Sequence, residues 1–288
     1  MADIEEDFLS RNQKVKAAFK APPFIPRRVL KDLGTEKITG DRYFSHEFMQ
    51  QEWEKVWKKT WHFVMKASEL DQPGAFYTHE LGKESFLFVR GSDDQIRGFY
   101  NVCRHRGNRL CQVEEGVVST FTCPYHGWKW NDDGSLKQVA DPQFFRQFDE
   151  GIPEEELGLV PVKIDVWEGW LWFNMDGDSC SLRDYLGPIG EHLETYHFED
   201  CAVLDYQTFE WNANWKHAWD AFNESYHFAE LHPNMVNIGE GHDVPIELYG
   251  IHSRMLNFNR TVSEVLEDRS SWTELRRRFM LSEAALGP

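Results

Sequence analysis

Long apolar runs, an excess of basic residues and a large set of cysteines are all missing from this 288-residue sequence. No stretch reaches the ~18 apolar residues that a membrane-spanning helix needs. Acidic residues outnumber basic ones by 48 to 31, which gives a net charge of −17. Duplex binding depends on basic patches, so a nucleic-acid partner is disfavoured. The sequence therefore predicts neither a membrane protein nor a nucleic-acid-binding one.

A secretion signal is also absent, because Met1 to Asp7 are mostly acidic and lack the order of basic and then apolar residues. We therefore expect a cytoplasmic location. The chain has five cysteines, and two of them, Cys103 and Cys123, fall in the motifs described next. The odd remainder favours free thiols over disulfides in a reducing compartment.

Two short strings contain cysteine and histidine closely spaced and closed by a glycine. They are Cys103-Arg104-His105-Arg106-Gly107 and Cys123-Pro124-Tyr125-His126-Gly127-Trp128. Two thiolates and two imidazoles form the ligand set of a Rieske [2Fe–2S] centre, and glycine permits the turns that let two loops converge. A zinc site accepts the same residue types, but a single residue between Cys103 and His105 is tighter than its usual spacing of two to four.

A second motif lies downstream, between Asn214 and Pro233. It reads Asn-Trp-Lys-His-Ala-Trp-Asp-Ala-Phe-Asn-Glu-Ser-Tyr-His-Phe-Ala-Glu-Leu-His-Pro. Its apolar residues recur at helical spacing and Pro233 is its only breaker, so we expect one helix that ends near His232. Four of its polar residues would share one face of that helix, namely His217, Asp220, Glu224 and His227. Two histidines with a carboxylate make the facial triad that binds Fe(II) and activates O2.

Both motifs resemble those of one protein family. The segment from Trp53 to Met175 is similar to the N-terminal part of the large subunit of Rieske-type non-haem iron oxygenases, which hydroxylate or demethylate small organic molecules with O2. The string from Asn214 is similar to the mononuclear-iron motif of the same family. By this resemblance the chain is an oxidoreductase with two cofactors, a [2Fe–2S] cluster and Fe(II).

The resemblance also assigns the site residues. Cys103, His105, Cys123 and His126 would hold the cluster, and His227 and His232 would bind the mononuclear iron. Glu224 would bridge the cluster of one subunit to the iron of the next, although the family usually has aspartate there. The family's third iron ligand is a carboxylate far beyond the histidines, and we find no match for it before Pro288. We therefore expect a fragment or a shortened product of a longer enzyme.

The expected fold is α+β, with a Rieske β domain followed by a partial catalytic domain. By resemblance to the family, the catalytic domain would be of the helix-grip type. The predicted parts are an arm and a helix packing on the catalytic part (1–59), the Rieske domain (60–176) and the catalytic part (177–288). Within them we expect an extended arm to residue 44, a helix from Ser45 to about Lys59, and an amphipathic helix at the end. That last helix is Trp272 to Leu281. The expected strands are 85–90, 96–102, 117–123, 162–167 and 170–174, with the last two joined by a turn at Glu168-Gly169.

The predicted function is that of a terminal oxygenase component. Electrons from a ferredoxin or a flavin reductase would pass through the cluster to the iron. Oxygen from O2 would enter a small, partly hydrophobic organic substrate, a class that includes aromatic compounds. The resemblance implies a homotrimer. The alternative is a Rieske electron-transfer protein, or a catalytically incomplete fragment that lacks the third iron ligand.

Overall fold

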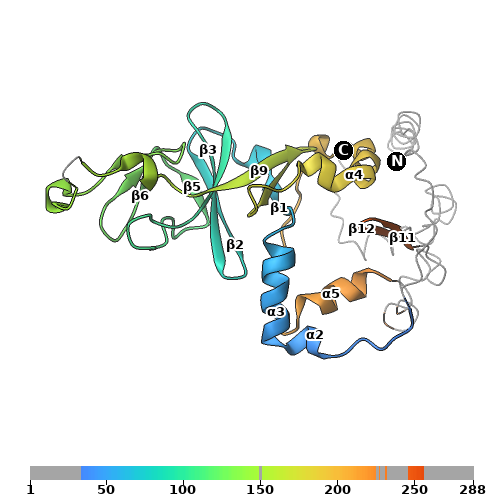
Figure 1. Ribbon diagram of the computed structural model, residues 1–288. Coiled ribbons are helices and arrows are strands. Elements are labelled where there is room, and N and C mark those ends of the chain that lie inside the picture. The colour runs from blue at the N-terminus through green and yellow to red at the C-terminus, as the bar shows by residue number, and fades with distance from the viewer. Residues whose placement is uncertain (1–33, 149–150, 225–226, 228–230, 232–245, 256–288) are drawn as a thin grey trace, which may run out of the picture. The chain divides into compact units, whose positions relative to one another are not determined.

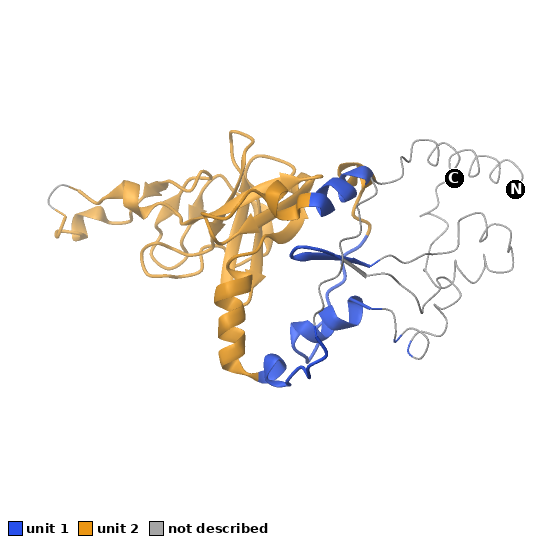
Figure 2. Ribbon diagram, turned by 45° about the vertical axis from the view of Figure 1, so that its right-hand side comes forward, with its two compact units in different colours: residues 1–44, 188–195, 205–288 blue, residues 45–187, 196–204 orange. Residues whose placement is uncertain are grey.

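The computed structural model describes residues 34–148, 151–224, 227, 231 and 246–255. The chain divides into two compact units, which Figure 2 distinguishes by colour. Unit 2 comprises residues 45–187 and 196–204, and unit 1 comprises residues 1–44, 188–195 and 205–288. Within the described ranges, none of the helices combines the length and the apolar content that crossing a bilayer requires.

Unit 2 begins with a helix that the sequence predicts. Ser45 is the N-cap of α3 (His46–Glu52), and its side-chain oxygen accepts a hydrogen bond from Phe48 N at 3.2 Å. The helix continues as a π-helical turn, η1 (Trp53–Trp57). The expected helix from Ser45 to about Lys59 is therefore confirmed, with its final turn wound more widely than an α-helix.

The main sheet of unit 2 has seven strands in the order β1-β10-β9-β4-β3-β2-β5, and every neighbouring pair is antiparallel (Figure 1). Its strands are β1 (His62–Lys66), β2 (Ala75–Leu81), β3 (Glu84–Arg90), β4 (Ile96–Tyr100), β5 (Glu115–Val117), β9 (Pro161–Trp167) and β10 (Trp170–Asn174). The predicted hairpin at Glu168-Gly169 is confirmed, since Trp167 pairs with Trp170 on either side of it.

A second, three-stranded sheet follows β5 and consists of β6 (Phe121–Thr122), β7 (Lys129–Trp130) and β8 (Leu136–Gln138). The prediction of one strand over residues 117–123 was wrong. Val117 ends β5 by pairing with Ala75, whereas Phe121 pairs with Trp130 in the other sheet. Val118 N still makes the next ladder bond, to the carbonyl of Gly74 at 2.9 Å, and the chain then bends at Ser119 and Thr120 before β6 begins.

The core of unit 2 lies on both faces of the main sheet at β3. Phe86 and Phe88 point into one apolar cluster, and Leu87 and Val89 point into another, and all four side chains are fully buried. Alternate residues of a strand face opposite sides, so a continuous apolar run is what a strand buried on both faces requires. The cluster around Leu87 and Val89 also contains Cys103, Cys123, Trp128 and Trp130. The predicted ligand loops are therefore anchored in the core.

A long helix, α4 (Leu182–Leu193), runs from unit 2 into unit 1 and is broken at Gly187, where φ is 50° and ψ is −136°. Pro188 explains the break, because a proline disfavours the α conformation in the residue before it. Single 3-10 turns complete the connections, namely η2 (Ala67–Glu69), η3 (Pro142–Phe144), η4 (Glu154–Leu157), η5 (Glu194–Tyr196) and η6 (Phe198–Asp200).

Unit 1 contains α2 (Asp41–Phe44), α5 (Trp215–Phe222) and a hairpin of β11 (Ile246–Tyr249) and β12 (His252–Met255). The expectation of an extended arm up to residue 44 was wrong at its end, since residues 41–44 form α2. This short helix is held by contacts with α5, which the sequence pattern does not reveal. Residues 1–33 and the predicted helix from Trp272 to Leu281 lie outside the described residues.

Candidate metal centres

The two cysteine loops of unit 2 have the same backbone conformation. In each loop the cysteine N–H donates to the carbonyl five residues ahead, and the cysteine carbonyl accepts from the glycine four residues ahead. The bonded pairs are Cys103 N with Asn108 O (2.8 Å), Gly107 N with Cys103 O (2.9 Å), Cys123 N with Trp128 O (2.8 Å) and Gly127 N with Cys123 O (3.0 Å). Gly107 and Gly127 have φ values of +72° and +73°, which favour glycine at both turns.

The two thiols meet in the core of unit 2. Cys103 is 3% exposed and Cys123 is 2% exposed, and both belong to the same apolar core cluster. Burial raises the pKa of the Cys103 thiol, while hydrogen bonds from the backbone of His105 and Arg106 lower it in part. Iron binds the thiolate form of cysteine. Metal binding would therefore release the thiol proton, although burial without a metal favours the protonated thiol.

The two histidines converge on the same place. The ring centroids of His105 and His126 are 4.8 Å apart at an angle of 67°. The His105 ring also stacks on Trp128, with centroids 4.7 Å apart and planes 6° from parallel. Burial lowers the pKa of His105, and the nearby charges of His126 and Arg106 add to this effect. The imidazole is therefore biased toward the neutral form that binds metals.

The ring nitrogen Nδ1 of His105 shows whether the site formed by the two loops fits a metal. His105 Nδ1 is buried and makes no hydrogen bond within the part of the chain that the structure describes. Buried ring nitrogens are almost always hydrogen-bonded or metal-bound, and this one lies in the loop of the buried Cys103. His126, in contrast, is exposed beside Tyr125, whose ring centroid is 3.9 Å away. The donor set fits a cluster with one covered histidine and one at the surface.

In unit 1, α5 carries the start of the second motif. Asn214 is its N-cap, and the Asn214 side chain accepts from Lys216 N at 3.1 Å. The same side chain donates to the carbonyl of Tyr43 at 3.1 Å. His217 and Asp220 are exposed residues on this helix. The asparagine thus has a structural role, as cap and as anchor to α2.

The expected single helix through the motif was wrong at Asn223 and Glu224, which interrupt it, and most of the motif after Glu224 lies outside the described residues. Asn223 is the C-cap of α5, and its side-chain amide donates back to Trp219 O at 2.8 Å. Glu224 is not helical, and its Oε2 accepts from His227 N at 3.3 Å. His227 O then accepts from Leu231 N at 2.9 Å. Side-chain hydrogen bonds such as that of Asn223 can end a helix, and the periodicity of apolar residues in the sequence does not reveal such a break.

The structure brings Glu224 and His227 together. Glu224 Oε1 forms a short contact with His227 Nδ1, and the His227 side chain is 21% exposed. An imidazole whose Nδ1 is held by a carboxylate has its tautomer fixed, with Nε2 directed at a metal. His232 lies outside the described residues, and no third ligand is assigned.

Three arginines of the ligand-loop region have separate contacts. Arg104 donates to Glu156 O at 3.4 Å, Arg109 pairs with Glu80 at 2.8 Å, and the Arg106 guanidinium lies 5.9 Å from the centre of the Tyr125 ring. All three arginines are exposed. Arg106 and the Tyr125 ring therefore lie beside His126, whereas Arg104 and Arg109 are engaged with Glu156 and Glu80.

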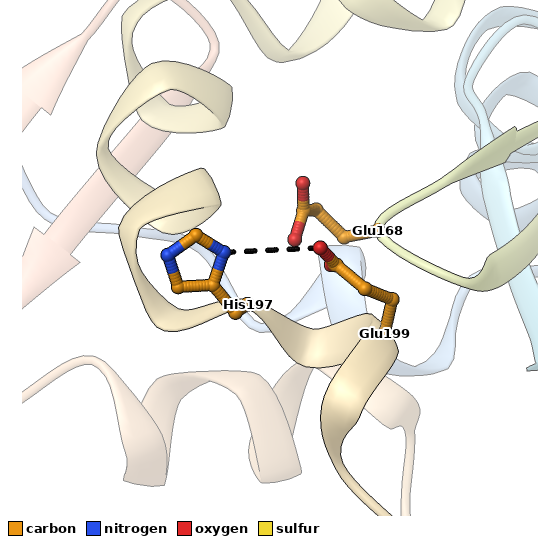
Figure 3. A group of neighbouring side chains, drawn as sticks. All are labelled: Glu168, His197 and Glu199. Atoms are coloured by element: carbon orange, nitrogen blue, oxygen red, sulfur yellow. Dashed lines mark ion pairs between the residues drawn. The ribbon is translucent and has the colours of Figure 1, made fainter.

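A third cluster of metal-binding residue types lies apart from both motifs. Glu168, His197 and Glu199 place ligand atoms within 4.8 Å of one another, and Figure 3 shows the ion pair between His197 and Glu199 at 3.8 Å. Glu168 precedes the hairpin glycine, and His197 and Glu199 lie at η6. His197 and Glu199 are exposed, and surface groups of this kind are common in proteins that bind no metal there.

Comparisons with known proteins agree with both motifs. The family described as the Rieske [2Fe-2S] domain matches residues 60–149, and the ring hydroxylating alpha subunit (catalytic domain) matches residues 192–281. The first match decides between a [2Fe–2S] cluster and zinc in favour of the cluster. The two matches together confirm an α+β chain with a Rieske domain ahead of a catalytic domain.

Among curated proteins, the carnitine monooxygenase oxygenase subunit of Acinetobacter baumannii is 33% identical over 202 residues, which are 68% of this chain and 52% of that protein. The glycine betaine monooxygenase oxygenase subunit of Pseudomonas aeruginosa is 30% identical over 194 residues, 67% of this chain and 44% of that protein. The chain therefore spans about half the length of these relatives.

A solved structure of a quaternary ammonium Rieske monooxygenase is similar as well. It superposes with a TM-score of 0.70 at 29% sequence identity, covering 76% of this chain and 60% of that chain. A TM-score of this size together with both family matches establishes common ancestry over the Rieske region and the start of the catalytic region.

Proposed function

Because the chain is a member of the Rieske oxygenase family, with a [2Fe–2S] domain ahead of a mononuclear-iron domain, we propose that it serves as a terminal oxygenase component. It would insert oxygen from O2 into a small organic substrate. The observation that carries this proposal is the presence of both family domains in one chain. A protein that only carries electrons has no need of the catalytic domain matched at residues 192–281.

In this proposal the cluster is held by Cys103, His105, Cys123 and His126. The two cysteines and the ring of His105 are covered by the core and by Trp128, whereas His126 is exposed. The covered residues would keep water from the cluster, and the exposed imidazole of His126 would be the ligand open to a redox partner. The bound cofactors supply one-electron transfer at the cluster and O2 activation at the iron.

His227 and His232 would hold the mononuclear iron, with Glu224 as the positioning carboxylate. The contact between Glu224 and His227 Nδ1 supports this role, because it orients the imidazole and leaves Nε2 for the metal. We propose that Glu224 also completes the electron path from the cluster of a neighbouring subunit, in a homotrimer. The similar solved structure was reported to give insight into inter-subunit electron transfer in its own protein.

For the substrate we propose a small quaternary amine. The relatives with 33% and 30% identity are named for carnitine and glycine betaine. An aromatic substrate is the second candidate, because the matching catalytic domain is described as ring hydroxylating. We further propose a ferredoxin or flavin reductase as donor, a cytoplasmic location, and a division of the chain into residues 1–59, 60–176 and 177–288.

The test is substrate-dependent oxidation of the pre-reduced cluster. The protein is reduced and mixed with O2 in the presence of carnitine, glycine betaine or naphthalene, and the Rieske absorption is followed. We expect a quaternary amine to accelerate oxidation and to yield an oxygenated product. His227→Ala should abolish this acceleration and leave the Rieske spectrum intact. If the rate of cluster oxidation is the same with every substrate and in His227→Ala, the protein is an electron carrier instead.

A further inference from the structure

The two ligand loops of unit 2 share the same hydrogen-bond pattern between cysteine and glycine, but the strand pairing that joins the two ends of each loop differs. The second loop is closed by the ladder between β6 and β7. In the first loop, which the structure describes completely, the strand-like closure is limited to an isolated bridge between Val102 and Arg109. The hydrogen bond that follows it, from Leu110 N to Asn101 O, is long at 3.4 Å. Backbone pairing alone therefore closes the first loop weakly.

The side chain of Asn101 completes this closure. Its Oδ1 accepts from Cys111 N at 2.8 Å, and its Nδ2 donates to Cys111 O at 2.8 Å. This exchange of two hydrogen bonds with one residue imitates a hydrogen-bonded pair in an antiparallel ladder. Nδ2 also donates to Ser85 Oγ at 3.1 Å, which ties the pair to β3. Asn101 is 3% exposed, so water does not compete for these bonds.

The loop that Asn101 closes contains Cys103 and His105, half of the cluster ligands. It also contains the backbone groups of His105 and Arg106 that hydrogen-bond to the Cys103 sulfur. Hydrogen bonds to the cysteine sulfurs and exclusion of solvent are two factors that set the reduction potential of an iron–sulfur cluster. Both depend here on whether the ends of the first loop stay together.

We propose that Asn101 is a positioning residue for the Rieske cluster, and that its amide replaces the missing strand ladder and holds the Cys103 and His105 loop at the geometry that sets the potential. The inference rests on the proposed function, because it requires the cluster. It concerns a residue that touches neither the metal nor the substrate and acts through the loop alone.

The test compares four proteins: the parent chain, Asn101→Leu, Ser85→Ala and Asn131→Leu. Leucine keeps the approximate size and neutrality of asparagine but cannot hydrogen-bond. Asn131 is a matched control in the same domain, since its Nδ2 donates to Ser135 Oγ at 2.9 Å in the turn after β7 and takes no part in closing the first ligand loop. Midpoint potentials come from redox titration, and the electron paramagnetic g-values of the reduced cluster report its geometry. Iron and sulfide content and thermal unfolding are measured in parallel.

For Asn101→Leu we expect altered g-values and a lower potential, with the one-electron equilibrium shifted at least tenfold, or about 59 mV. The potential falls because the hydrogen bonds to the Cys103 sulfur weaken when the loop opens. Ser85→Ala removes the outer bond and the 2.7 Å bond from Ser85 Oγ to Glu80, but it leaves both bonds between Asn101 and Cys111. Asn131→Leu removes no bond that closes the first loop, so both variants should match the parent. If Asn101→Leu does not fold, Asn101→Ser is compared with Asn131→Ser by the same criteria.

The outcomes separate this inference from the proposed function. A parent chain that shows no Rieske signal would contradict the proposed function, and the inference with it. A parent chain with the signal, whose Asn101 variant has the same potential and g-values, would overturn the inference alone. An equal shift in the Asn131 variant would also overturn it, because the effect would then be general loosening of the domain.

Discussion

The phenol of Tyr43 donates a 2.6 Å hydrogen bond to Asp220 Oδ2 and joins two residues that are 177 positions apart. The Tyr43 ring also stacks on His217, with centroids 4.3 Å apart and planes 12° from parallel, and its carbonyl accepts from Asn214. Tyr43 thus contacts α5 from its N-cap to its last turns. A helix of eight residues is marginal by itself. These contacts fix the segment that leads into the proposed iron ligands.

Removing the Tyr43 hydroxyl should therefore loosen α5. In Tyr43→Phe we expect backbone amides of residues 215–223 to exchange about 2- to 10-fold faster, the range for one lost hydrogen bond. Tyr77→Phe is the control, because its hydroxyl makes a longer contact of 3.4 Å with Glu114 in unit 2. Hydrogen exchange followed by mass spectrometry measures both variants. Equal exchange in α5 of Tyr43→Phe and the parent would show that the hydroxyl adds nothing.

The same bond has a pH dependence. The hydrogen bond to Asp220 is the main cause that raises the pKa of Tyr43 above its usual value of 10. A group whose pKa is raised on folding stabilises the folded state fully below its unfolded pKa, and this contribution is lost as the pH rises through the folded value. The difference in exchange between Tyr43→Phe and the parent should therefore be constant at neutral pH and disappear above pH 10.

The sequence predicts what is encoded by neighbouring residues. The ligand loops and the β9–β10 hairpin depend on contiguous strings, and each was predicted from the chemistry of those strings. The Tyr43 contact with Asp220 depends on tertiary folding, and no local pattern reports it. The break after Phe222 was missed for a different reason, because the side-chain hydrogen bonds of Asn223 and Glu224 leave the apolar periodicity unchanged.

The unequal exposure of the two proposed cluster histidines, His105 and His126, leads to a prediction about the reduction potential. His126→Cys replaces the exposed imidazole with a thiolate, which stabilises the oxidised cluster more strongly. We expect the cluster to be retained and its potential to fall by more than about 200 mV, toward the values of clusters with four cysteines. His46→Cys, at an exposed position of α3, is the control and should not change the potential. A redox titration with an unchanged midpoint would remove His126 from the ligand set.

The remaining cysteines should differ in reactivity. Burial raises the pKa of Cys111 to about 12, whereas Cys180 and Cys201 are exposed. Thiolates are the reactive form, so iodoacetamide at pH 8 should label Cys180 and Cys201 and leave Cys111 unmodified until the protein unfolds. Peptide mass spectrometry after alkylation checks this. The buried thiol should also make folding less favourable as the pH rises from about 9 to 12, an effect that Cys111→Ala removes.

The last prediction concerns Glu224, whose carboxylate contacts His227 at both the backbone N–H and the ring Nδ1. Glutamine keeps one oxygen that can accept from the backbone, so the hydrogen bond from His227 N should persist in Glu224→Gln. The variant loses the charge and the second acceptor. Loss of a carboxylate that orients a metal-binding histidine typically costs about 10- to 100-fold in activity or metal affinity. In the full-length protein we therefore expect both metals to remain largely bound, while electron transfer from the reduced cluster slows by about that factor.

Rapid mixing of the pre-reduced cluster with O2 and substrate measures this transfer directly. Glu210→Gln is the matched control, because Glu210 is an exposed glutamate that precedes α5 and should have no effect. A slower cluster oxidation in Glu224→Gln, with iron content and the Rieske spectrum unchanged, separates electron transfer from metal binding. If the cluster of this variant oxidises as fast as that of the parent, Glu224 acts only as a hydrogen-bond partner of His227, and the path between subunits runs through other residues.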